Sequence, residues 1–209
     1  MSAENFPKYR DDIPPQKRSN GFFMAVLLVG ILTIGFANFF RGQLRNAFKP
    51  EDSEWIGKEF PPVEAAGWFN RDSQTPIQDE LKGQIYVVDA WAFWCGPCQA
   101  SVPSVIELYK KYSPKGVKFL GLTAEGYDYS AGKEDPVGIE ESEKFVKGLG
   151  IPWPNGYGAE KTLTALQVDS IPQLWIVDRT NKIVYHGIGW DPSDVGKIEH
   201  VIEEALNAK

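Results

Sequence analysis

The sequence predicts a single α/β domain that follows one membrane-spanning helix, and three observations lead to this prediction. Short apolar runs alternate with longer amphipathic runs from residue 85 to residue 208. This alternation is typical of a sheet whose strands are connected by helices. An uncharged apolar run precedes that region, at residues 22–40. The chain has 209 residues, of which 43% are apolar, so it can build one full core besides that run.

The apolar run has the length and composition of a transmembrane helix. Its 19 residues span about 29 Å at about 1.5 Å each, close to the roughly 30 Å hydrocarbon core of a bilayer. A cleaved signal peptide is the alternative, but its apolar region is usually only about 7–15 residues long. We therefore favour an uncleaved anchor. The predicted regions are an N-terminal tail at 1–20, the anchor at 21–40, a juxtamembrane linker at 41–54 and the α/β domain at 55–209.

Basic residues flank the apolar run on both sides. Lys17 and Arg18 precede it, and Arg41 and Arg45 follow it. The numbers of basic residues on the two sides are similar, so the positive-inside rule gives only a weak preference for one orientation. A short tail inside and a large domain outside is the simpler arrangement, so we predict a single-pass membrane protein with an extracytoplasmic domain on the periplasmic side.

The charge is unevenly distributed along the chain. The net charge is −6, and residues 1–49 contain seven Lys or Arg against three Asp or Glu. That segment is therefore +4 and residues 50–209 are −10. Nucleic-acid binding requires a basic surface, so the acidic domain argues against a nucleic-acid partner.

Periodicity and turn residues locate the elements of the predicted domain. A continuous β-branched and aromatic run at 85–91 is typical of a buried central strand. The pairing of strands on either side of a turn at Asn181 is expected to be antiparallel. Further strands are predicted at 117–123, 174–177 and 183–186, with a short stretch around Trp153; helices are predicted at 99–112, 140–149, 160–167 and 194–208; residues 124–138 are predicted to be a surface loop.

The only two cysteines lie at Cys95 and Cys98, where the strand at 85–91 meets a helix. A helix N-terminus offers unpaired N–H groups and a partial positive charge, which lower the pKa of a thiol. Three residues are about one helical turn, so Cys98 faces the same side as Cys95 and can close a disulfide with it. Pro97 suits a first helical turn. This pattern predicts thiol–disulfide exchange, with Cys95 attacking and Cys98 resolving.

Metal binding is the rival interpretation of the two cysteines. A structural zinc site needs four ligands, and only His186 and His200 remain to complete one. Covalent haem attachment needs a histidine directly after the second cysteine, where this chain has Gln99. We therefore expect no metal and no cofactor beyond the redox-active pair, and we interpret both histidines as surface or packing residues.

Asp89 is an acid in the middle of the apolar strand, six residues before Cys95. Burial raises the pKa of a carboxyl group. Such a group can accept the proton of Cys98 during resolution. The alternative is a solvent-facing Asp89 on a half-exposed strand.

The segment Val88-Asp89-Ala90-Trp91-Ala92-Phe93-Trp94-Cys95-Gly96-Pro97-Cys98 closely resembles the active-site strand and loop of the thioredoxin-like superfamily. Ile56-Gly57-Lys58, Pro61-Pro62 and the segment at 79–84 resemble the start of its membrane-tethered TlpA/ResA-like branch. Ser170-Ile171-Pro172-Gln173 and the strand after it resemble the family's cis-proline loop. The resemblance covers roughly residues 55–209.

The resemblance implies a thioredoxin-like fold, a central mixed β-sheet flanked by helices. Cys95 would be the nucleophile, Cys98 the resolving thiol and Asp89 the buried carboxylate. The resemblance also implies a substrate surface, in which Pro172 is cis and faces the disulfide, Ile171 offers its backbone and Trp94 shields the thiols. Gly96 and Pro97 would complete this surface.

The chain departs from the family pattern at two positions near this surface. Gln99 stands where the family often has Arg or Lys, and Gln173 stands where it often has Thr. Both departures leave the choice of substrate open. Glu125, after the second strand, is a further candidate for an active-site acid.

Three classes of function follow from these residues. The first is a reductase of disulfides in extracytoplasmic proteins, which receives electrons from a membrane or thioredoxin-type donor. The Gly-Pro pair between the cysteines favours it, because thioredoxin, at about −270 mV, has the same pair. The second is a disulfide oxidase or isomerase, and the third is a redox-inert binding module. A peroxidase typically needs a lone peroxidatic cysteine in a different context.

Overall fold

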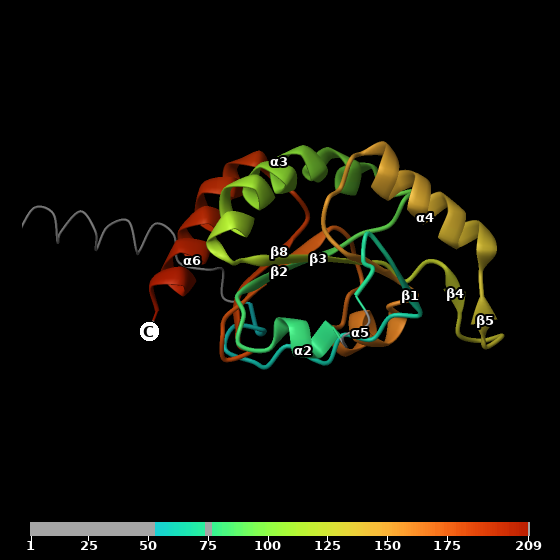
Figure 1. Cartoon of the computed structure of the whole chain (residues 1–209), viewed down its shortest axis with the longest axis horizontal. Helices are drawn as coiled ribbons and strands as arrows, with labels where there is room; N and C mark the ends of the chain where they lie inside the picture. The colour runs from blue at the N-terminus through green and yellow to red at the C-terminus, as the bar shows by residue number, and fades with distance from the viewer. Residues whose placement is uncertain (1–52, 74–76, 209) are drawn as a thin grey trace, which may run out of the picture. The chain divides into compact units, whose positions relative to one another are not determined.

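The computed structural model describes residues 53–73 and 77–208. The predicted tail, the predicted anchor and most of the predicted linker lie outside these residues. In the described part of the chain, no helix is long and apolar enough to cross a membrane. The predicted α/β class is confirmed for this part, which consists of a mixed sheet between two layers of helices (Figure 1).

The main sheet has six strands in the order β1-β6-β3-β2-β7-β8. β2 runs parallel to β3 and antiparallel to β7, and β8 is antiparallel to β7 as predicted from the turn. β6 is parallel to β3 and antiparallel to β1. The strands are β1 (Gly67–Phe69), β2 (Tyr86–Ala90), β3 (Lys118–Leu122), β6 (Asn155–Tyr157), β7 (Gln173–Val177) and β8 (Ile183–Ile188).

Helices cover both faces of this sheet, as Figure 1 shows. One face carries α3, α4 and α6, and the other carries α2 and α5. The helices are α2 (Ile77–Leu81), α3 (Gly96–Tyr112), α4 (Pro136–Gly148), α5 (Glu160–Ala165) and α6 (Val195–Asn207), with short 3₁₀ turns η1 (Ser113–Lys115) and η2 (Pro192–Asp194).

The central strand β2 is buried on both faces, which explains its continuous apolar sequence. Successive side chains of a strand point to opposite faces. Val87 and Trp91 accordingly belong to the core under α3, α4 and α6, whereas Tyr86, Val88 and Ala90 belong to the core under α2 and α5. This two-sided burial fixes the end of β2, and with it the start of α3, between the two layers.

Helix α3 begins three residues before the predicted start at Gln99. Cys95 is its N-cap, and Gly96 and Pro97 form its first turn. The N–H groups of a first turn have no partner within the helix, so residues that break helices elsewhere are tolerated there. The helix ends at η1, and Gly116 then adopts a left-handed conformation with φ of 90°.

The prediction for residues 124–138 as one surface loop was wrong. β4 (Tyr127–Asp128) and β5 (Lys133–Glu134) form a small antiparallel hairpin there. Helix α4 then starts at Pro136, earlier than the predicted residue 140, because Asp135 accepts a hydrogen bond from the Val137 N–H and caps the helix.

A second correction concerns the short strand expected around Trp153. Trp153 is a buried core residue, and the strand β6 starts two residues later, at Asn155. The turn at Asn181 is confirmed, with φ of 63°. The other predicted strands and helices agree with the structure to within a few residues at each end.

Candidate active site

Cys95 and Cys98 form a disulfide at the N-terminus of α3, with 5.2 Å between their Cα atoms. The backbone N–H of Cys98 donates to Sγ of Cys95 over 3.2 Å. The same N–H can stabilise a Cys95 thiolate when the pair is reduced, together with the positive end of the helix dipole. The geometry therefore favours Cys95 as the sulfur that carries negative charge.

Both sulfur-bearing residues lie just beneath the surface. Cys95 is 4% exposed and Cys98 is 1% exposed. The residues around them, Trp94, Gly96 and Pro97, are exposed. A partner sulfur can therefore approach Cys95 along this exposed strip, whereas Cys98 is the more buried of the two.

The loop before β7 packs against the disulfide from another part of the chain. The peptide bond between Ile171 and Pro172 is cis, as the family resemblance implies. The carbonyl oxygen of Ile171 lies 3.8 Å from Sγ of Cys95. Pro172 is buried and Ile171 is half-buried. The structure thus brings together residues that are 76 positions apart in the sequence.

Asp89 lies in the middle of β2 and is 6% exposed, so the alternative of a solvent-facing carboxylate was wrong. Strand alternation places it on the same face as Val87 and Trp91, whose core cluster includes Cys98. Burial raises the pKa of Asp89 to about 7. A carboxyl group with this pKa can take up and release a proton near neutral pH.

Trp94 is 63% exposed, so it is not a core residue. Its Nε1 donates to Oε1 of Glu125 over 2.9 Å. Glu125 lies three residues after the end of β3, and the β4–β5 hairpin comes next in the chain. This contact links the residue before Cys95 to the segment that sequence analysis treated as a plain loop.

Two residues near the site have roles that the sequence did not predict. His186 is buried and stacks on Trp175, which confirms the prediction of a packing residue, and its Nε2 also lies 2.8 Å from Oε1 of Gln173, a hydrogen bond that the sequence did not predict. Gln173 is also buried and follows Pro172 directly. The sequence signal was a polar residue beginning an apolar strand, next to the proline loop. Its partner could not be found without the register of β7 and β8.

Neither histidine forms a metal site with the cysteines in this structure. Both cysteines are in the disulfide. Within residues 53–73 and 77–208, no group of three or more His, Cys, Asp or Glu side chains is arranged to hold a metal ion.

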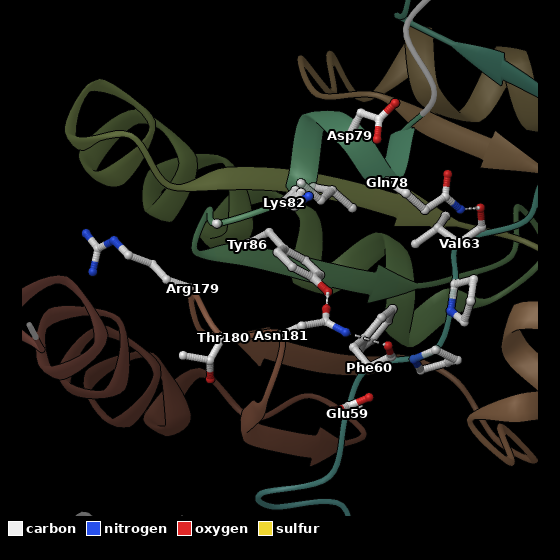
Figure 2. Close-up of a pocket in the computed structure, with 14 residues that line it drawn as sticks. Glu59, Phe60, Val63, Gln78, Asp79, Lys82, Tyr86, Arg179, Thr180 and Asn181 are labelled. Carbon is white, nitrogen blue, oxygen red and sulfur yellow. Dashed lines mark hydrogen bonds between the residues drawn. The ribbon is translucent and has the colours of Figure 1, made fainter.

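A separate cavity of about 520 Å³ opens on the other face of the sheet, beside α2. Figure 2 shows its side chains, which include Tyr86, Gln78 and Asn181. The hydroxyl of Tyr86 donates to Oδ1 of Asn181 over 2.5 Å, and Nδ2 of Asn181 donates to the Phe60 carbonyl oxygen over 2.9 Å. These three polar groups therefore form one hydrogen-bonded chain along the wall of the cavity.

Comparison with known proteins gives consistent matches. A family model described as Redoxin matches residues 56–202. The thiol-disulfide oxidoreductase ResA of Bacillus thuringiensis is 25% identical over 169 residues, which cover 80% of this chain and 87% of that protein. Protein DipZ of Mycobacterium tuberculosis is 26% identical over 146 residues, which cover 68% of this chain and 19% of that protein.

A solved structure has the same fold as the described residues. It is a DsbE-type thiol:disulfide interchange protein from Chlorobium tepidum, with a TM-score of 0.60 and 22% identity. The match covers 72% of this chain and 97% of that one. At this identity the similarity bears on the fold alone, which is thioredoxin-like.

Proposed function

Because the chain belongs to the Redoxin family and is a thiol–disulfide oxidoreductase, we propose that it reduces disulfides of extracytoplasmic proteins through the Cys95–Cys98 pair. The observation that carries this proposal is the position of the pair at the start of α3, with the Ile171 carbonyl beside Cys95. The sulfur of Cys95 lies beside the exposed strip of residues, and the sulfur of Cys98 is more deeply buried and can resolve the mixed disulfide.

The reaction starts from the reduced pair. The Cys95 thiolate attacks one sulfur of the substrate disulfide, and a Cys95–substrate disulfide forms while the other substrate sulfur leaves as a thiolate and takes a proton from water. Cys98 then loses its proton and attacks Sγ of Cys95. The second substrate thiolate leaves, and the enzyme retains the Cys95–Cys98 disulfide. Two electrons have passed to the substrate.

Asp89 is the proposed proton acceptor for Cys98. It lies on the face of β2 that carries the core around Cys98. Its raised pKa, about 7, means that the ionised and protonated forms are both populated near neutral pH. The group can thus take the Cys98 proton in resolution and return it when the enzyme is reduced again.

The surface around Cys95 is the proposed substrate site. Exposed Gly96 and Pro97 allow a polypeptide to approach the sulfur, and the exposed Trp94 ring provides an apolar contact beside it. The half-buried Ile171 offers backbone groups to an extended substrate segment next to the buried Pro172. Recognition through backbone groups suits an enzyme that accepts several protein disulfides.

We further propose that the anchor at residues 21–40 holds this domain outside the cytoplasm, where disulfides are common. The length of the apolar run supports the anchor. A membrane or thioredoxin-type dithiol donor would reduce the Cys95–Cys98 disulfide after each turnover. The full chain should stay in membranes that are washed with alkaline carbonate, and its release would contradict the anchor.

The direction of electron flow is tested by the reduction potential of the pair. The full chain, in detergent, is equilibrated with glutathione or dithiothreitol buffers, and the fraction of free thiol is measured. A potential near or below about −250 mV, close to thioredoxin, supports the reductase. A potential above about −180 mV, in the range of isomerases, would overturn it in favour of an oxidase or isomerase.

A further inference from the structure

A buried amide closes the loop that carries the cis-proline. Gln173 follows Pro172 and is 2% exposed. Its Nε2 donates to the carbonyl oxygen of Ser170 over 2.9 Å. The side chain therefore spans Ile171 and Pro172 and joins the end of the loop to its beginning.

His186 holds this amide from the neighbouring strand β8. Oε1 of Gln173 lies 2.8 Å from Nε2 of His186. Since an amide oxygen only accepts, and the amide nitrogen already donates to Ser170, the proton between them belongs to His186 Nε2. Nδ1 lies 2.7 Å from the Ser53 hydroxyl, which donates to it when the ring is neutral. In a neutral imidazole, these hydrogen bonds select the tautomer that is protonated at Nε2.

The surroundings of His186 fix this arrangement. Its ring stacks on Trp175, with 5.0 Å between the ring centroids and 9° between the planes. Trp175 pairs with His186 across β7 and β8, and Gln173 pairs with Ile188, so Gln173 and His186 are diagonal neighbours on the sheet. Burial lowers the pKa of His186, against a smaller opposing effect of Glu54. The neutral form is therefore favoured.

We propose that Gln173, held by His186, is a positioning residue that fixes the Ile171 carbonyl beside Cys95 and keeps the loop ready for a substrate backbone. The proposal rests on the proposed function and adds a determinant of substrate affinity to it. The 3.8 Å contact between Ile171 O and Cys95 Sγ connects this loop to the reacting sulfur. Without the amide, a protein substrate must order the loop when it binds, which weakens binding.

The test compares a protein disulfide with a small one. Full-length Gln173→Leu is assayed with insulin, with dithiothreitol as the electron source, and the pre-reduced protein, freed of dithiothreitol, is mixed with 5,5′-dithiobis(2-nitrobenzoic acid) in a single turnover. We expect KM for insulin to rise on the order of fivefold, the equivalent of about one lost hydrogen bond. The kcat and the rate with the small disulfide should stay within about twofold, because the small molecule needs no ordered loop.

His186 variants provide the matched rescue. His186→Phe keeps a ring that can stack on Trp175 but removes the donor to Gln173, so it should reproduce the rise in KM. His186→Gln keeps an N–H donor on its side chain and should restore KM towards the wild-type value. Tyr86→Phe removes one hydrogen bond on the same face of the sheet but at the far end of β7, where Tyr86 pairs with Val177, and should leave KM unchanged.

Three results would overturn the inference. These are an unchanged KM in both Gln173→Leu and His186→Phe, an equal loss of rate with the small disulfide, or the same rise of KM in Tyr86→Phe. A spectroscopic measurement is independent of activity: ¹⁵N spectra of wild-type His186 should show a proton on Nε2 and none on Nδ1, and the reverse tautomer would overturn the inference. Failure of the wild-type protein to reduce insulin would instead contradict the proposed function.

Discussion

Two buried polar residues of the central strand β2, Tyr86 on one face of the sheet and Asp89 on the other, have different surroundings. On the face under α2 and α5, the Tyr86 hydroxyl and the Asn181 amide bond to each other, and Asn181 continues to the Phe60 carbonyl (Figure 2). On the face under α3, Asp89 is buried among apolar residues and its pKa is raised to about 7 by burial alone. Both groups come from the same strand, β2.

The difference separates structural from chemical use of a buried polar group. A satisfied hydroxyl contributes to stability and has no tendency to exchange its proton. A desolvated carboxyl group reduces stability when it ionises, and the protein retains it where a proton must move. The comparison therefore identifies Asp89 as the chemical group and Tyr86 as a structural one, and substitutions at these two residues should have opposite signatures.

The largest expected effect is the loss of turnover in Cys95→Ser. A serine hydroxyl does not form a disulfide, so insulin reduction should fall to the uncatalysed rate. Cys98→Ser is the matched variant, because it keeps the attacking sulfur and loses only the resolving one. It should accumulate a Cys95–substrate disulfide that a non-reducing gel detects. Insulin reduction by Cys95→Ser above background would disprove the assignment of the nucleophile.

Asp89→Asn should raise the free energy of unfolding and also lower the rate of resolution by Cys98. The folded pKa of Asp89, about 7, lies above the ordinary value of 3.8 for this side chain, so folding favours the protonated form. Below pH 3.8 the carboxyl group is protonated in both states and has no effect. As pH rises towards 7, wild-type stability should fall by up to about 4 kcal/mol, and it should be constant above that. Urea unfolding of the oxidised proteins at pH 4 to 8 measures this difference.

The rate of resolution in Asp89→Asn tests the chemical role of the carboxyl group. Wild-type resolution should accelerate as pH rises through about 7, where Asp89 ionises. Asp89→Asn should lose this step and slow by roughly 100-fold at neutral pH, as is typical for removal of a general base. Stopped-flow measurement of Cys98 attack on a preformed mixed disulfide isolates the step. A variant that keeps the wild-type pH profile would assign Asp89 a structural role only.

The sequence predicted the structure around the cysteines better than the structure on the face under α2 and α5. The apolar run of β2, the position of the cysteines at a helix start and the acid at Asp89 are local patterns, and each was found where it was expected. The contact between Ile171 and Cys95 joins distant segments. The family resemblance implied only that Pro172 faces the disulfide. The hydrogen bonds of Tyr86 with Asn181 and of His186 with Gln173 depend on strand register, which no local pattern specifies.

The hairpin β4–β5 was missed for a different reason. Its strands are two residues each, too short for an alternating pattern to be visible among Gly, Asp and Tyr. The early start of α4 was missed because its cap, Asp135, precedes a proline and lies in a polar stretch that reads as a loop. Both errors concern segments whose structure depends on single hydrogen bonds more than on burial.

The smallest expected effect is that of a substitution at Tyr86, the structural group of the comparison. Tyr86→Phe removes the donor to Asn181 and should lower the free energy of unfolding by about 1 kcal/mol. Burial raises the pKa of Tyr86, so the hydroxyl remains protonated and the loss should be the same from pH 5 to pH 9. Insulin turnover should equal that of the wild-type protein. Urea unfolding and the insulin assay across this pH range measure both quantities. A loss of stability that varies with pH, or a fall in turnover, would show that Tyr86 is coupled to the active site, and the separation between structural and chemical polar groups would no longer hold.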